Sequence, residues 1–102
     1  MKMVQTLETV KTEQEINLID NVFTAAEAAT IINDVLNAKI NFHKIKRLSI
    51  KEGNENDACE YDNGRIQELL NEQQIAKEFF SQARIQGKKL KIKSKVYIGL
   101  EE

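Results

Sequence analysis

The 102-residue sequence contains no proline, no tryptophan and only four glycines. Proline and glycine interrupt helices, so their scarcity favours long continuous elements. A single cysteine excludes an internal disulfide and a Cys-x-x-Cys metal pair. No apolar run approaches the length needed to cross a membrane or to form the core of a signal peptide. We therefore expect a cytoplasmic protein that does not associate with membranes.

The charge is nearly balanced, with 15 basic and 16 acidic residues and a net charge of −1. Such a balance gives no general attraction to nucleic acid or to anionic membranes, so an electrostatic partner would have to meet a local patch. The hydrophobic content of 41% is ordinary for a globular protein.

Two apolar stripes with the same spacing, three and four residues in alternation, are the main signal in the sequence. The first consists of Ala28, Ile31, Val35, Ala38, Phe42 and Ile45, and the second of Ile66, Leu69, Gln73, Ala76, Phe80 and Ala83. This spacing is typical of amphipathic helices. Because a short polar segment separates the stripes, the sequence predicts an antiparallel helical hairpin with these stripes as its seam.

The first helix has a clear start signal in the run Phe23 to Ala28. Thr24 and Glu27 have the spacing of a capping box, in which each side chain binds the backbone N–H of the other residue. We expect a helix from Ala25 to about Glu52, although the β-branched residues near its end make a kink or an earlier end an alternative.

A turn follows at Gly53–Asp57. The second helix begins between Ala58 and Arg65, with Asp57 or Asn63 as its cap. It ends at Gly87, which is a favourable residue just past a helix C-terminus.

Alternating apolar residues predict a strand before the hairpin and another after it. Ile16, Leu18 and Val22 alternate in the first, and the second is a half-buried strand over Leu90–Leu100 with a lysine-rich face. The expected fold class is α+β with the order β-α-α-β, the terminal strands pairing antiparallel. Residues 1–14 are expected to form a flexible arm, and residues 15–102 a single domain.

The charges are complementary in the antiparallel sense. Basic residues crowd the second half of the first helix, and acidic residues crowd the start of the second. Likewise Glu13, Glu15 and Asp20 oppose Lys91, Lys93 and Lys95 across the strands, where opposite charges stabilise modestly. Most of these charges are thus explained as solvated, mutually compensating faces.

No motif points to catalysis, to a cofactor or to a metal. His43, the only histidine, lies beside the Phe42 seam, where a surface or packing role is expected. Cys59 has acidic neighbours that disfavour a thiolate. With Gly64 at the glycine position of a calcium loop, Cys59 would stand where a carboxylate is required, so that match fails. We expect a non-enzymatic protein without a cofactor.

A second apolar strip accompanies each stripe, formed by Ile32 and Leu36 on the first helix and by Ile75 and Phe79, with Leu70, on the second. Two short strands cannot cover both strips. We therefore interpret the chain as a protein-interaction module that forms a homodimer, with Ile32, Leu36, Ile75 and Phe79 as its candidate interface.

The alternative is nucleic-acid binding through the last strand. Lys91, Lys93 and Lys95 could contact phosphates, and Tyr97 on the same face could stack on a base. A single aromatic residue and no arginine on this face make it the second choice. Lysines on an exposed strand also protect against edge aggregation.

Three short runs carry a resemblance to a family. Phe23–Ala28, Ile40–Lys44 and Leu90–Lys93 resemble small uncharacterised bacterial proteins of the Bacteroidetes type. The resemblance covers most of residues 23–95. It implies no activity, and no functional residue can be transferred from it.

Overall fold

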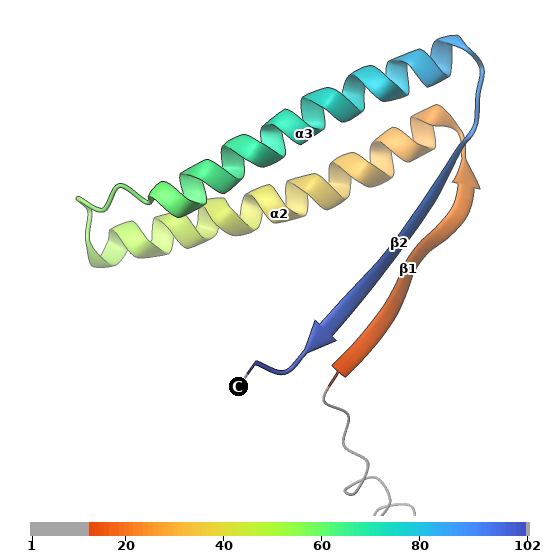
Figure 1. Cartoon of the computed structure of the whole chain (residues 1–102). Helices are drawn as coiled ribbons and strands as arrows, with labels where there is room; N and C mark the ends of the chain where they lie inside the picture. The colour runs from red at the N-terminus through yellow and green to blue at the C-terminus, as the bar shows by residue number, and fades with distance from the viewer. Residues whose placement is uncertain (1–12, 102) are drawn as a thin grey trace, which may run out of the picture. The chain divides into compact units, whose positions relative to one another are not determined.

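The computed structural model describes residues 13–101. In chain order the elements are β1 (Glu13–Phe23), α2 (Ala25–Gly53), α3 (Glu60–Ile85) and β2 (Leu90–Gly99). β1 and β2 pair antiparallel in a two-stranded sheet, and the two helices run side by side (Figure 1). The predicted α+β class and the β-α-α-β order are confirmed.

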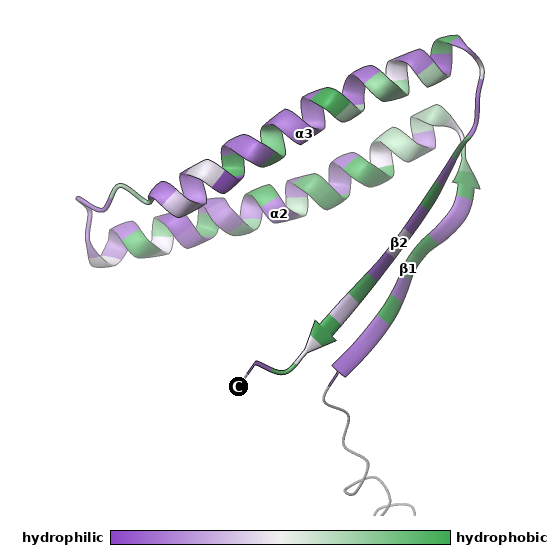
Figure 2. Cartoon of the chain, in the orientation of Figure 1, coloured by the Kyte–Doolittle hydropathy of each residue, from purple (hydrophilic) through white to green (hydrophobic). Residues whose placement is uncertain are grey.

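The chain divides into two compact units, a ribbon of β1 and β2 and a hairpin that comprises residues 23–90. In the ribbon, hydrophobic and hydrophilic residues largely alternate along β2 and follow each other less regularly along β1 (Figure 2). Lys95 Nζ lies 3.0 Å from Glu15 Oε2, which confirms the predicted charge pairing across the strands at this position. The predicted arm lies outside the described residues except for Glu13 and Gln14, and these two belong to β1.

The start of α2 is fixed by the predicted capping box. The Glu27 N–H donates to Thr24 Oγ1 at 3.1 Å, and the Thr24 N–H donates to Glu27 Oε1 at 2.9 Å. Each bond satisfies a backbone donor that has no partner within the helix. From here α2 continues without interruption to Gly53, so the alternative of an earlier end is wrong.

The start of α3 differs from both predicted caps. Cys59 occupies the N-cap position with a left-handed backbone (φ 51°) and makes no side-chain cap bond. Asp57 Oδ1 instead accepts the Cys59 N–H at 2.8 Å, and the Asn63 amide donates to the Ala58 carbonyl at 2.9 Å. Asp57 and Asn63 therefore bind backbone groups of the turn around Cys59, and neither is the N-cap residue of α3.

The end of α3 follows the glycine signal. Gly87 has a φ of 65°, which glycine adopts without steric cost. The Gly87 N–H donates to the Arg84 carbonyl and the Lys88 N–H to the Ala83 carbonyl, both at 3.0 Å. This pair of bonds is the Schellman motif, which ends a helix by satisfying its last carbonyls.

The seam between the helices confirms the stripe predicted for α3 and corrects the one predicted for α2. Ile66, Leu69 and Ala83 are buried, and the other members of the α3 stripe are half-buried. On α2 the hydrophobic cluster of the seam contains Ile40, with Leu36 packed against it. Val35, Phe42 and Ile45 are instead exposed by 46%, 53% and 68%. The predicted α2 seam is therefore wrong over most of its length.

The reason is that α2 carries two apolar faces, and the one that contains His43 faces α3. Leu36, Ile40 and His43 are separated by four and three residues, and each lies one or two positions from Val35, Phe42 or Ile45. Ile32 and Leu36, predicted as part of an exposed strip, are half-buried as a result. Apolar periodicity alone does not distinguish these faces, because the chosen face contains a polar residue that is buried with a partner.

Replacing Thr24 with alanine tests the capping box. We expect Thr24→Ala to lower the free energy of unfolding by about 1 kcal/mol, because the Glu27 N–H loses the hydroxyl that accepts it. Urea denaturation measures the change. Thr30→Ala is the matched control: the Thr30 hydroxyl bonds the Ala26 carbonyl within the same helix, and its loss should have little effect. Equal losses in both variants would contradict the assignment.

Candidate functional site

One candidate site is a buried polar pair between the helices. His43 on α2 and Asp62 on α3 are exposed by only 3% and 4%, and His43 Nδ1 lies 2.8 Å from Asp62 Oδ1. Of the two roles expected for His43, the surface role is wrong and the packing role is confirmed. The histidine belongs to the seam, and its acidic partner comes from the charge complementarity expected between these ends of the helices.

The geometry of this pair favours structure over catalysis. A carboxylate that accepts from the Nδ1–H of a histidine is the arrangement that orients catalytic bases. Here, however, His43 Nε2 is buried and has no hydrogen-bond partner among the described residues. The rings of Phe42 and Tyr61 lie 5.1 and 6.1 Å from the imidazole, both edge to face. A base must come within hydrogen-bond reach of its substrate, and Nε2 belongs to a side chain that is exposed by only 3%. The pair instead fixes the register of α2 against α3.

Removing one partner of the pair should destabilise the hairpin. Asp62→Ala leaves His43 Nδ1 buried without its acceptor, and we expect a loss of about 1–3 kcal/mol in the free energy of unfolding. The double variant with His43→Leu and Asp62→Leu should recover part of this loss, because no buried polar group remains.

Glu68→Ala is the matched control for this prediction. Glu68 lies on the same helix and pairs with Arg65 at 2.6 Å on the exposed surface, so its removal should cost less than about 1 kcal/mol. Urea denaturation compares the three variants. A loss in Asp62→Ala no greater than in Glu68→Ala would show that the pair does not hold the seam.

Cys59 is buried near the pair, and its surroundings disfavour a reactive thiolate. Its Sγ lies 3.8 Å from the carbonyl oxygens of Arg47 and Asp57. Burial, followed by the nearby Asp57 carboxylate, raises the pKa of the Cys59 thiol. Because the thiolate is the nucleophile, this confirms the expectation that the acidic neighbourhood disfavours it.

Alkylation with iodoacetamide tests the state of Cys59. At pH 8 we expect the folded protein to react at least about tenfold more slowly than the protein in urea, because the raised pKa and burial limit the accessible thiolate. An exposed cysteine, introduced as Lys44→Cys in a Cys59→Ala chain, should react at the same rate folded and unfolded. A native Cys59 as reactive as that control would contradict the burial.

Residues 13–101 contain neither a cluster of metal-ligating side chains nor a helix that could span a membrane. These residues contain no group of three or more histidine, cysteine or acidic side chains that could hold a metal ion. Neither α2 nor α3 has an apolar stretch long enough to span a bilayer.

The second candidate site is the exposed apolar face of α2, here called the α2 stripe. It consists of Ile31, Val35, Ala38, Phe42 and Ile45. Ile31 is half-buried and the other four are exposed. Val35, Ala38, Lys39 and Phe42 enclose a shallow hollow, and the Lys39 ammonium lies 5.2 Å from the centre of the Phe42 ring. The sequence contained this signal, but the prediction placed the stripe against α3.

The opposite flank of α2 is polar and is linked to α3. Gln73 Nε2 donates to Asn37 Oδ1 at 2.8 Å, and Asn33 and Lys77 lie around the same shallow depression. Leu70, from the predicted second strip on α3, also lines this depression. The α2 stripe is thus a distinct apolar surface beside the seam.

On α3, the predicted interface residues Ile75 and Phe79 are exposed by 62% and 60%. The Phe79 ring lies edge to face with that of Phe80, 6.0 Å away. Ile75 and Phe79 therefore remain available to a partner, whereas Ile32 and Leu36, the other two residues of the predicted interface, are half-buried in the hairpin.

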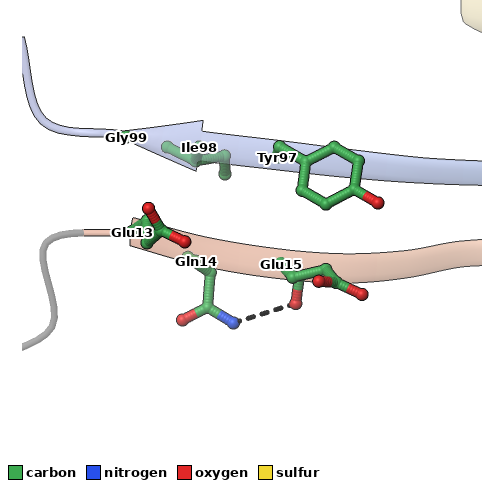
Figure 3. Close-up of a pocket in the computed structure, with 6 residues that line it drawn as sticks. All are labelled: Glu13, Gln14, Glu15, Tyr97, Ile98 and Gly99. Atoms are coloured by element: carbon green, nitrogen blue, oxygen red, sulfur yellow. Dashed lines mark hydrogen bonds between the residues drawn. The ribbon is translucent and has the colours of Figure 1, made fainter.

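The lysine face of β2 shares the ribbon with carboxylates. Lys91, Lys93, Lys95 and Tyr97 are all exposed, but Lys95 pairs with Glu15. Glu13 and Glu15 line the same hollow as Tyr97 (Figure 3). A nucleic-acid phosphate at this end of the ribbon would approach these carboxylates as well as the lysines.

Comparison of the chain with models of protein families, with curated proteins and with solved structures finds no match.

Proposed function

We propose that this protein is a non-enzymatic interaction module that assembles with a second copy of itself through the α2 stripe. The observation that carries the proposal is the exposure of Val35, Phe42 and Ile45 on a helix whose other apolar face is already occupied by α3. Contiguous apolar surface of this kind marks interaction sites in soluble proteins.

The size of the surface supports a specific contact. A half-exposed large apolar side chain offers on the order of 100 Å². With Leu48, which is exposed by 63% beside the stripe, each copy would contribute roughly 400 Å² of apolar surface. Two copies and their polar rims reach about 1,200 Å², the lower end of stable interfaces. Because α3 already holds α2 in helical form, little backbone order would be lost on binding.

Nucleic-acid binding through Lys91, Lys93, Lys95 and Tyr97 is the second function proposed from the sequence. The pairing of Lys95 with Glu15 and the position of Glu13 beside Tyr97 weaken it relative to self-assembly. It predicts salt-sensitive binding that decreases when the three lysines become glutamine.

Light scattering coupled to size exclusion tests self-assembly at micromolar concentration. We expect a particle of twice the 11.7 kDa chain mass for the natural sequence. Phe42→Lys should give a single-chain particle, because a charge placed in a buried apolar interface lacks a partner.

Phe79→Lys is the matched control, with the same substitution at a similarly exposed phenylalanine on α3. It should leave the dimer intact, and circular dichroism should show both variants helical. A monomeric natural chain would contradict the proposal. Dissociation by Phe79→Lys but not by Phe42→Lys would also contradict it, and would show that the interface contains Ile75 and Phe79.

A further inference from the structure

The α2 stripe carries both a projection and a recess. Phe42 is its largest side chain, and Ala38, one turn earlier, is its smallest member. We infer that two copies pack α2 against α2 in antiparallel orientation, with Phe42 of each copy over the hollow at Ala38 of the other. This inference rests on the proposed self-assembly and adds its geometry.

The shape of the hollow indicates a helical partner. Its four lining residues, Val35, Ala38, Lys39 and Phe42, stand at positions i, i+3, i+4 and i+7. Four residues so spaced on one helix form the hole that receives one side chain of a facing helix in knobs-into-holes packing. The alternating spacing of the stripe repeats this arrangement along the helix, as a coiled-coil seam does.

The order of side-chain sizes selects the antiparallel orientation. In an antiparallel pair centred between Ala38 and Phe42, each phenylalanine faces an alanine, and Val35 faces Ile45 of the second copy. Leu48 then lies near Ile31 of the second copy, which would cover another exposed leucine. A parallel pair would align Phe42 with Phe42 and Ala38 with Ala38. The layer with two phenylalanines would be overpacked and the layer with two alanines would leave a cavity, and both are unfavourable.

The charges along α2 also favour the antiparallel pair. Its first half, up to Ala38, carries only acidic residues, Glu27 and Asp34. Its second half, from Lys39, carries five basic residues and Glu52. Antiparallel packing places the acidic half of each copy beside the basic half of the other, and it opposes the two helix dipoles.

One charge contact opposes the antiparallel pair. The two Lys39 side chains approach each other near the twofold axis, whereas a parallel pair would bring Asp34 near Lys39 of the second copy. Exposed charge pairs of this kind contribute little. The packing of the buried layers therefore determines the orientation, which is antiparallel.

Disulfide cross-linking between single-cysteine chains tests the orientation. Val35→Cys and Ile45→Cys are made separately in a Cys59→Ala chain, with tags of different length, then mixed and oxidised. We expect the mixed Val35–Ile45 disulfide to form at least about tenfold faster than either disulfide between identical chains. A Cys59→Gly background, which suits the positive φ at this position, is the second choice if Cys59→Ala does not fold. Lys44→Cys, exposed outside the stripe, reports random collision.

Each alternative result overturns a different statement. Disulfides between identical chains that outpace the mixed one would establish the parallel pair and refute the inference. A dimer in light scattering whose stripe cysteines react no faster than the Lys44→Cys control would place the interface elsewhere and also refute it. A monomeric chain would refute the proposed function itself.

Discussion

The hairpin depends on the register of α2 against α3, and a short polar contact fixes that register. His43 and Asp62, 2.8 Å apart and almost fully buried, must face each other, since a buried polar group without its partner is costly. Once they do, Ile40 meets Ile66 and Leu69 in the hydrophobic cluster. Hydrophobic contact alone would tolerate several rotations of α2, and the polar pair selects one.

That selection determines what remains outside the hairpin. The side of α2 that carries Ile40 and His43 packs against α3, so it cannot contact another partner. The other apolar face, with Val35, Phe42 and Ile45, is left exposed. Burying a polar pair at the seam and exposing an apolar stripe beside it is unfavourable in an isolated hairpin. It is favourable when the stripe is covered by a second copy, which is the basis of the proposed assembly.

Local signals predicted most of the fold from the sequence. The capping box at Thr24, the glycine at position 87 and the alternation in the strands act within a few residues, so the sequence reveals them directly. The α3 stripe was also predicted correctly, with Ile66, Leu69 and Ala83 buried. The face of α2 was not predictable in this way, because hydrophobic periodicity does not register a histidine buried by a distant aspartate. For the same reason, Ile32 and Leu36 were expected on an exposed strip, and Phe42 in the core.

Hydroxyl-radical footprinting of the natural chain over a dilution series tests the central claim most directly. Phe42 and Phe79 are similarly exposed in the single chain, by 53% and 60%, so their oxidation rates can be compared within one sample. If a second copy covers the α2 stripe, Phe42 is protected at high concentration and becomes exposed on dilution, since assembly follows mass action, while Phe79 reacts at a constant rate. Oxidation of Phe42 at the rate of Phe79 at every concentration would contradict the account.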